Sequence, residues 1–339
     1  MRDEKGLPLI SIIIPVFNGA RSIGRLVDTL IAELTVDYAI EIVLVNDCSP
    51  DDSENACIEV QRRHASSVRF FSLARNVGEH NAVMAGLNQC RGDYALIMDD
   101  DFQNPACSVI KLIQTCIRSD HDVVYTYYET KQHSWFRRRG SDFNDIVANV
   151  MLRKPKDLYL SSFKIINRFL IDEIIKYQLP FPYIDGLILR TTANIGKIQV
   201  EHGKREFGRS GYTLRKLISL WSNMFVNFSI LPLRVAVVLG FAFSLLGLGL
   251  GIEAIVEWIF YPGNPMGYSA LIVAVSAFSG IQLIAIGMIG EYLGRIFLSQ
   301  SRTPQFVIRK SVESVEERPL TAGRFRAGTE SLHGMHVPR

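Results

Sequence analysis

Two glycine-rich patterns that hold nucleotide phosphates are missing from the chain. Gly-x-Gly-x-x-Gly does not follow the first apolar stretch, and Gly-x-x-x-x-Gly-Lys-[Ser/Thr] occurs nowhere in the 339 residues. The first pattern is typical of dinucleotide-binding folds and the second of Walker-type phosphate sites, so both classes are disfavoured. A phosphate-bearing ligand would have to be held through a metal ion and by basic side chains.

Cysteine pairs, excess charge and an apolar leader are also missing. None of the five cysteines forms a Cys-x-x-Cys pair, so we interpret them as reduced thiols in a reducing compartment. The net charge is only +3, which gives no argument for nucleic acid as a partner. The first six residues, Met-Arg-Asp-Glu-Lys-Gly, contain no apolar run, so no signal peptide is expected. The cysteines are Cys48, Cys57, Cys90, Cys107 and Cys116.

The chain is long and rich in apolar residues. Its 339 residues are enough for two domains. Hydrophobic residues make up 48% of them, and the mean hydropathy of +0.14 is high for a soluble protein. The distribution of these apolar residues along the chain therefore indicates which part is a folded domain and which part is a membrane segment.

The first 130 residues alternate between apolar stretches and helical stretches. Residues 9–17 are almost all apolar and often β-branched, which is typical of a parallel strand buried on both faces. The alternation predicts an α/β fold with a mostly parallel sheet and helices on both faces. Ligands of such sheets bind at the carboxyl ends of the strands. We expect strands at 9–17, 39–46, 69–72, 94–98 and 122–127, and helices up to about 35 and at about 52–65, 79–90 and 105–118.

Three consecutive aspartates, Asp99, Asp100 and Asp101, follow the apolar stretch 94–98. In an extended segment the side chains alternate, so Asp99 and Asp101 would point one way and Asp100 the other. Neighbouring carboxylates repel one another, and a divalent cation is the usual compensation. Two oxygen ligands suit Mg²⁺ or Mn²⁺, which keep coordination positions for substrate phosphates. The alternative is a solvated acidic turn that caps the next helix.

Polar side chains also stand at the ends of the other expected strands. Each group has a local explanation, as a helix N-cap or as a surface residue. Because the carboxyl ends of parallel strands share one edge of the sheet, four such groups predict a nucleotide-type ligand there. Besides the aspartates, the residues are Pro15, Phe17, Asn18, Asp47, Arg75, Asn76 and His80.

The middle of the chain is predicted to close this site. Residues 131–140 are basic and aromatic, and form either a solvated loop or a lid that approaches phosphate and headgroups. A short strand at 161–166 and a helix at 168–177 follow. Residues 180–186 are rich in turn signals and contain Asp185, which could be a general base, a sugar ligand or a turn former.

The segment 202–212 combines cations, glycines and hydroxyl groups. Such a loop can surround a phosphate through bidentate arginine bonds and backbone N–H groups. Its position directly before the long apolar runs strengthens this interpretation. The candidate phosphate ligands are His202, Arg205, Ser210 and Tyr212.

The last third has the pattern of a membrane segment. Residues 213–231 place apolar side chains at helical spacing beside basic ones, which favours an interfacial helix. Residues 231–252 and 269–289 are each long enough to cross a bilayer. The connection 253–268 has no Lys or Arg, whereas the outer flanks do, so both ends of the hairpin are expected on the cytoplasmic side. A strand is expected at 305–309.

Together these motifs resemble a family-2 glycosyltransferase of the polyprenyl-phosphate type. Relatives in this family include dolichyl-phosphate mannose synthase and bacterial enzymes that load glucose or aminoarabinose onto undecaprenyl phosphate. The resemblance covers about residues 7–300. It rests on Pro15-Val-Phe-Asn, Val45-Asn-Asp-Cys-Ser-Pro-Asp51, Arg75-Asn-Val-Gly-Glu-His-Asn-Ala-Val-Met-Ala-Gly86, residues 98–105, and Arg205-x-x-Gly208-x-Ser210-x-Tyr212, followed by two spanning helices.

The resemblance implies a GT-A fold and assigns roles within it. Asp47 would contact the nucleotide base, Asp99 would lie by the nucleoside, and Asp101 would bind Mg²⁺ or Mn²⁺ directly. The family often has a small residue at the position of Asp100, which is a departure. The implied catalytic residues are Asp99, Asp101, Asp185 and Arg205, and the implied metal ligands are Asp101 and Asp99. The residues implied to bind the nucleotide sugar are Pro15, Phe17, Asn18, Asp47, Asn76, His80, Asp99 and Asp100. The residues implied to bind the lipid phosphate are His202, Arg205, Ser210 and Tyr212.

The implied reaction is inverting transfer of a sugar from a nucleotide sugar, UDP-linked by analogy, to undecaprenyl phosphate at the cytoplasmic face of the membrane. A phosphate oxyanion is already a nucleophile, so Asp185 need not act as a base. Three alternatives stay open: a processive polysaccharide synthase, which usually carries the Gln-x-x-Arg-Trp that is absent here; a transferase acting on a glycan or protein; and a non-catalytic membrane scaffold.

The expected organisation is a glycosyltransferase domain at 1–212, an interfacial helix at 213–231, two transmembrane helices within 232–294 and a cytoplasmic tail at 295–339. The expected partners are a nucleotide sugar, a polyprenyl phosphate and the lipid bilayer. Gly247-x-x-x-Gly251 and Gly290-x-x-x-Gly294 permit close helix contacts and hint at a homo-oligomer.

Overall fold

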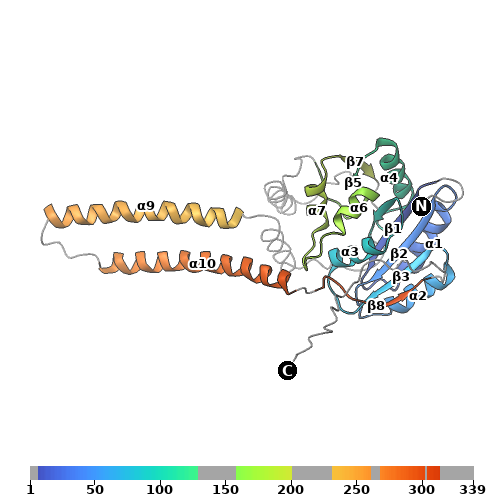
Figure 1. Ribbon diagram of the computed structural model, residues 1–339, viewed down its shortest axis with the longest axis horizontal. Coiled ribbons are helices and arrows are strands. Elements are labelled where there is room, and N and C mark those ends of the chain that lie inside the picture. Colours follow the sequence, from blue (N-terminus) through green and yellow to red (C-terminus); the bar gives the residue numbers. More distant parts are fainter. Residues whose placement is uncertain (1–6, 129–157, 201–230, 261–267, 302–303, 314–339) are drawn as a thin grey trace, which may run out of the picture.

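The computed structural model describes residues 7–128, 158–200, 231–260, 268–301 and 304–313. An eight-stranded sheet forms the centre of the α/β part, with the strand order β7-β5-β6-β4-β1-β2-β3-β8 (Figure 1). Strand β6 runs antiparallel to β4 and β5, and β8 runs antiparallel to β3, whereas the other pairs are parallel. The strands are β1 (Leu9–Val16), β2 (Ala39–Asn46), β3 (Val68–Leu73), β4 (Tyr94–Ile97), β5 (Val123–Tyr128), β6 (Lys164–Asn167), β7 (Ile195–Val200) and β8 (Ile308–Val312).

Helices cover both faces of this sheet, and two separate apolar clusters result. On β1 the side chains of Ile12 and Ile14 enter the cluster under α1, α2 and α4, while Ile13 enters the cluster under α3, α6 and α7. A strand buried on both faces needs apolar residues at nearly every position, which explains why β1 is apolar apart from Ser11. The helices are α1 (Ile23–Leu34), α2 (Ser53–Arg63), α3 (Glu79–Gln89), α4 (Ala106–Ser119), α6 (Arg168–Ile174) and α7 (Ile184–Thr191). The predicted mostly parallel α/β sheet is confirmed.

Two predictions about local structure are wrong. The turn-rich segment 180–186 ends in a helix, because α7 begins at Ile184 and carries Asp185 in its first turn. The extended path assumed for the aspartates is also wrong, because β4 ends at Ile97 and residues 100–102 form a bend. Phe102 adopts a left-handed φ of 63°, so the chain reverses direction immediately after the acidic residues.

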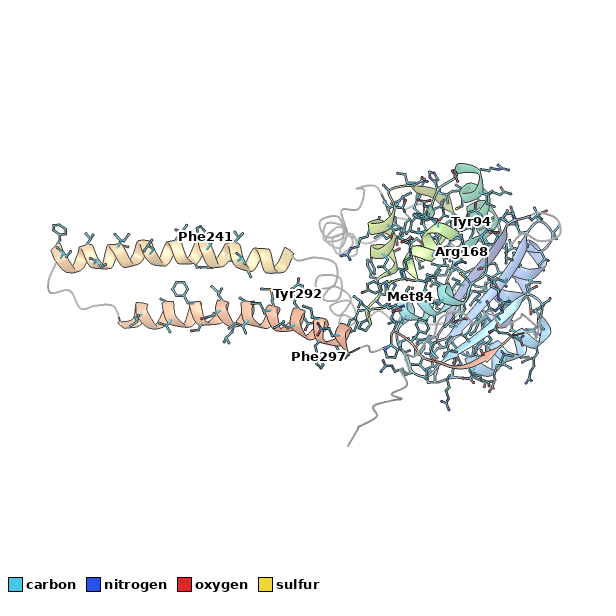
Figure 2. The ribbon with its side chains drawn as sticks, viewed as in Figure 1. Met84, Tyr94, Arg168, Phe241, Tyr292 and Phe297 are labelled. Carbon is cyan, nitrogen blue, oxygen red and sulfur yellow. The ribbon has the colours of Figure 1, made fainter. Side chains whose placement is uncertain are left out.

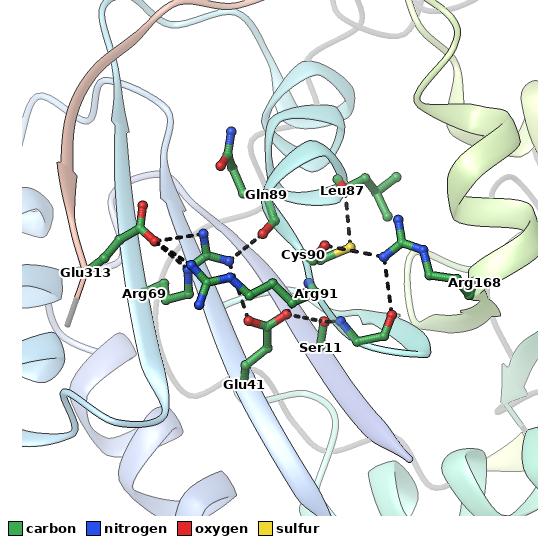
Figure 3. A network of polar contacts seen from close by, with 10 residues as sticks. Ser11, Glu41, Arg69, Leu87, Gln89, Cys90, Arg91, Arg168 and Glu313 are labelled. Atoms are coloured by element: carbon green, nitrogen blue, oxygen red, sulfur yellow. Dashed lines mark hydrogen bonds and ion pairs between the residues drawn. The ribbon is translucent and has the colours of Figure 1, made fainter. Parts of the chain in front are cut away.

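Strand β8 returns to the sheet after the hydrophobic helices and is fixed there by charged side chains (Figure 3). The Arg69 guanidinium contacts Glu313 at 2.8 Å and Glu41 at 3.5 Å, and Arg91 contacts Glu313 at 3.2 Å. Glu41 in turn accepts a hydrogen bond from the Ser11 hydroxyl at 2.5 Å. Arg69 of β3 and Arg91 therefore connect directly to Glu313, the residue that follows β8, and Arg69 links it to Glu41 of β2. The strand predicted at 305–309 is present, three residues further along.

The last two helices, α9 (Leu231–Phe260) and α10 (Tyr268–Gln300), form a hairpin that extends away from the α/β part (Figure 1). Their large apolar side chains point outward with no domain covering them, as Phe241 and Phe297 show at about 70% exposure (Figure 2). Both helices are long and apolar enough to span a membrane, through Ala236–Glu253 and Phe278–Leu298. Helix α10 begins at Tyr268, one residue before the predicted start at 269, and continues beyond the predicted end at 289 to Gln300.

Candidate active site

Asp47 connects the carboxyl ends of the first three strands. Its backbone N–H donates to the Val16 carbonyl at 3.0 Å, and its side chain accepts hydrogen bonds from the backbone N–H groups of Val77 at 2.8 Å and Gly78 at 2.9 Å. The Asn76 amide donates to the Asp47 carbonyl at 3.2 Å. The predicted convergence of these loops is therefore confirmed, whereas the role of Asp47 in base recognition stays a prediction.

Burial and hydrogen bonding change the pKa of the Asp47 carboxyl in opposite directions. Burial raises its pKa, and the two backbone N–H groups partly offset that increase, so the pKa stays above its ordinary value. Gly78 has a φ of 89°, a conformation that glycine adopts without strain. This glycine lets the chain turn so that two successive N–H groups reach the same carboxylate.

The loop after β1, which follows the Val16 carbonyl that accepts from Asp47, carries an exposed aromatic residue. Phe17 is 47% exposed, while Pro15 lies within the strand opposite Val45. Asn18 has a left-handed φ of 59°, and its N–H donates to the Ser49 hydroxyl at 3.2 Å. This loop therefore lies beside the loop after β2, with the Phe17 ring accessible to a ligand.

The three aspartates after β4 contact different parts of the fold. Asp99 Oδ2 accepts a hydrogen bond from the Ser162 hydroxyl at 2.8 Å. Asp100 Oδ2 packs against Gly19, where a Cβ would lie only 2.1 Å from it. Asp101 is 7% exposed, and its Oδ1 accepts from the Gln103 N–H at 3.2 Å. Asp99 and Asp100 therefore point to different elements, and the acidic segment joins the ends of β1 and β4 to the segment before β6.

A buried lysine that the sequence analysis missed lies close by. Lys164 on β6 is 3% exposed and donates to Asp185 Oδ1 in a close ion pair. The Tyr125 hydroxyl donates to the same oxygen at 2.9 Å, and burial together with Asp185 raises the pKa of that phenol well above its ordinary value. The available sequence signal was a lysine between apolar residues, Phe163 on one side and Ile165 on the other.

This contact set changes how Asp185 is understood. Its position in α7 excludes the turn-former alternative. Because Lys164 neutralises the carboxylate and Tyr125 donates to it, Asp185 holds α7 against β5 and β6. A general-base or sugar-binding role for Asp185 stays a prediction.

Glu79, at the start of α3, experiences the negative charge of the site. Desolvation raises the pKa of its carboxyl to about 7, and Asp99 contributes next to the increase. Asp185 and Asp100 raise the pKa further, while Lys164 lowers it. The sequence analysis did not select Glu79, because only folding brings the start of α3 near these carboxylates.

The acidic side chains fit a divalent cation as a partial donor set. Among the described residues, no group of three or more His, Cys, Asp or Glu side chains converges as a metal site. Mg²⁺ typically takes one or two carboxylates and completes its coordination with substrate phosphates and water. Desolvation is the main cause of the raised pKa of Glu79, and the smaller contribution of Asp99, Asp100 and Asp185 is negative charge that a bound cation would offset. The assignment of Asp99 and Asp101 as ligands of a metal that binds together with a diphosphate stays a prediction.

His80 joins α3 to α7. Its ring lies edge-on to the Tyr183 ring, with the centroids 5.2 Å apart. Burial lowers the pKa of His80 to about 4, Asp185 opposes this change, and Lys164 adds to it. The imidazole is therefore neutral at physiological pH, so its predicted contribution to nucleotide-sugar binding would be made by a neutral ring.

Because the pKa of His80 is lower in the folded protein than its ordinary 6.5, the unfolded chain binds more protons between pH 6.5 and 4. Folding stability should therefore be fully present above pH 6.5 and fall as the pH falls toward 4. By this linkage we expect His80 to account for a loss of about 2 kcal/mol between pH 7 and pH 5. Denaturation of wild type and His80→Gln at both pH values measures this, and an equal loss in the two proteins would contradict the assignment.

Several predicted site residues lie outside the described part of the chain. They are the basic loop 131–140 and the phosphate ligands His202, Arg205, Ser210 and Tyr212. The interfacial helix at 213–231 falls there as well, apart from Leu231. Their assignments stay predictions.

Comparison with known proteins shows what this chain resembles. Residues 11–191 match the family described as Glycosyl transferase family 2. The undecaprenyl-phosphate 4-deoxy-4-formamido-L-arabinose transferase of Sodalis glossinidius is 31% identical, over 92% of this chain and 96% of that protein. The protein of the same name from Pseudomonas savastanoi is 30% identical, over 92% and 93%.

A solved structure shares the fold. Glucosyl-3-phosphoglycerate synthase from Mycobacterium tuberculosis, crystallised with Mn²⁺, UDP-glucose and phosphoglyceric acid, superposes with a TM-score of 0.50. The sequence identity is 17%, and the superposition covers 65% of this chain and 78% of that one. The mostly parallel sheet thus has a counterpart among solved glycosyltransferases. The family match over more than half of the chain and the full-length relatives lead to one conclusion: the chain is a glycosyltransferase that belongs to glycosyl transferase family 2.

Proposed function

We propose that this enzyme transfers a sugar from a UDP-linked donor to a polyprenyl phosphate, in bacteria undecaprenyl phosphate, at the membrane surface. The observation that carries the proposal is the acidic sheet edge in a domain that continues into two exposed apolar helices. The relatives named as undecaprenyl-phosphate transferases match along nearly their whole length, including this hairpin. An acceptor that is itself a lipid explains why a sugar-transferring domain carries such helices.

Different residues of the sheet edge bind different parts of the donor. Asp47 and Asn76 face the nucleoside from the loops after β2 and β3, and the accessible Phe17 ring offers a surface for the base. Asp99 and Asp101 hold Mg²⁺ or Mn²⁺; the metal, when bound, neutralises charge on the diphosphate leaving group. The solved neighbour crystallised with Mn²⁺ and UDP-glucose supports both the donor class and the metal.

The acceptor phosphate supplies the nucleophile. A phosphate oxyanion carries its charge near neutral pH, so the reaction needs no strong general base. This agrees with Asp185 being paired with Lys164, because its Oδ1 oxygen is already occupied by the Lys164 ammonium and the Tyr125 hydroxyl. Attack from the face opposite the diphosphate inverts the anomeric centre. Arg205, with His202, Ser210 and Tyr212, is proposed to hold the phosphates on the membrane side.

The hairpin fixes the orientation of the enzyme. With both candidate spans in the bilayer and the basic flanks outside it, the catalytic domain and the C-terminus lie in the cytoplasm. Residues 213–231 would lie in the interface as an amphipathic helix. Strand β8 agrees with this arrangement, because it returns the chain after α10 to the same sheet that precedes α9. The two Gly-x-x-x-Gly pairs leave room for a homo-oligomer within the membrane.

The test separates this function from its alternatives. Membranes containing the enzyme are incubated with radiolabelled nucleotide sugars and undecaprenyl phosphate, and then extracted with organic solvent. Sugar in the lipid phase, dependent on Mg²⁺ or Mn²⁺, is the expected result. Label in long polymer would indicate a processive synthase, label on soluble glycan or protein would indicate another acceptor, and no transfer from any donor would indicate a scaffold.

A further inference from the structure

Two exposed apolar side chains lie beside the segment that leaves α10. Leu179, in the connection between α6 and α7, is 44% exposed, and Val307, just before β8, is 51% exposed. Their backbones are nevertheless fixed, since the Leu179 carbonyl accepts from the Gln305 amide at 2.6 Å and the Val307 carbonyl accepts from the Ala74 N–H at 2.9 Å. Both side chains are therefore held outward by structure that is itself well anchored.

Gln305 joins the two segments. Its amide nitrogen donates to the carbonyls of both Tyr177 and Leu179, at 2.7 and 2.6 Å, and the residue is only 9% exposed. Phe306 and Ile308 pack onto the apolar core. Gln305 lies in a bend, and Val307 is two residues further along, directly before β8 begins at Ile308. Leu179 and Val307 thus flank Gln305, the first through a hydrogen bond and the second along the chain, and we call this pair the Leu179/Val307 surface.

This surface is close to the end of a candidate membrane helix. Helix α10 ends at Gln300, and five residues of chain reach at most about 18 Å even when fully extended. In Figure 1 the domain end of α10 and helix α7 lie on the same side of the α/β part, the side from which the hairpin extends. Covalent connection and the Gln305 hydrogen bonds therefore keep the Leu179/Val307 surface near the point where α10 leaves the bilayer.

We infer that the Leu179/Val307 surface is a docking surface for the lipid bilayer, in contact with the boundary between headgroups and acyl chains. The inference rests on the proposed membrane location of the hairpin. Apolar side chains at that boundary are stabilised by leaving water, whereas they gain nothing from exposure. The contact has a functional consequence, because the anchored connection leads directly into α7, whose first turn holds Asp185 on Lys164. Through Gln305, a change in how deeply the domain lies in the membrane interface would therefore move the α6–α7 connection, and with it α7 and Asp185.

Fluorescence quenching tests the contact directly. In a Cys48→Ser/Cys107→Ser background, which lacks both exposed cysteines, an environment-sensitive thiol label is placed at Leu179→Cys or Val307→Cys. The proteins are reconstituted in phosphatidylcholine vesicles with and without nitroxide-labelled lipid. We expect the nitroxide to remove about half of the fluorescence at both positions, as for groups about 5–10 Å into the interface.

Two control positions make the outcome decisive. Val36→Cys is the negative control, because Val36 is 77% exposed but lies between α1 and β2, at the amino end of the strand. Leu245→Cys, on α9, is the positive control. Quenching at 245 with none at 179 and 307 would overturn the docking surface and leave the membrane location standing. Absence of quenching at 245 would overturn the membrane location itself, and the docking surface with it.

A further variant tests the part played by Gln305. Gln305→Met keeps the side-chain length but removes both donors to the α6–α7 connection. We expect the label at 179 to lose most of its quenching, while the label at 307, whose backbone is held by Ala74, keeps it. Unchanged quenching at both positions would show that Gln305 does not hold the connection at the membrane.

Discussion

Asp101→Asn is expected to reduce sugar transfer by a factor of about 10³ or more, because it removes a charge that stabilises the leaving diphosphate through the metal. The substitution is nearly isosteric. The new amide would retain an oxygen that accepts from the Gln103 N–H, so the bend after β4 should persist. The loss should therefore appear in the rate of transfer and not in the thermal midpoint. Initial rates into the lipid phase, measured at saturating Mg²⁺ or Mn²⁺, give the factor.

The matched control for this variant is Asp37→Asn, the same change at an exposed position between α1 and β2. It should keep wild-type activity. If Asp101→Asn also stayed within a few-fold of wild type, while its fold was intact, the assignment of Asp101 as a metal ligand would be wrong. A large loss of both activity and thermal stability would instead show that Asp101 acts through the fold, and would equally contradict the assignment.

Most of the fold could be predicted from the sequence because the determining pattern is local. The central parallel strands are covered on both faces, so Ile12, Ile13 and most of their neighbours in β1 are apolar, and the helices that follow are amphipathic. Helix α7 and strand β7 escaped prediction for physical reasons. Pro180 and Pro182 give a turn signal directly before α7, and β7 is an edge strand whose alternating exposure leaves no apolar run. Tertiary packing, not local preference, determines both.

The position of the candidate site was predictable, but the contacts between its side chains were not. Strand ends carry polar residues in the sequence, and the topology brings them to one edge. Which hydrogen-bond donor meets which carboxylate depends on contacts between distant elements: Lys164 and Asp185 are 21 residues apart, and Ser162 and Asp99 are 63 apart. Strand β6 and the residues just before it make both contacts because β6 inserts antiparallel between β4 and β5, an order that no local pattern specifies.

Lys164→Met is the second change with a large expected effect, and it acts on stability. Lys164 and Asp185 are both almost fully buried, so the substitution leaves the Asp185 carboxylate inside the protein with only the Tyr125 hydroxyl as a described donor. Removing one partner of a buried ion pair typically costs about 3–5 kcal/mol. Chemical denaturation of the detergent-solubilised enzyme measures this cost as a shift of the unfolding midpoint.

The chain contains its own control, since Lys176 pairs with Glu173 at a position where its side chain is 67% exposed. Lys176→Met should cost no more than about 1 kcal/mol, because water already screens an exposed pair. Adding Asp185→Asn to Lys164→Met should recover much of the lost stability, because the neutral amide no longer buries an unpaired charge while it can still accept from Tyr125. Equal shifts for Lys164→Met and Lys176→Met, or no recovery in the double variant, would show that charge pairing at Asp185 does not fix α7 on the sheet. In that case the position of α7 on the sheet would depend on apolar packing alone.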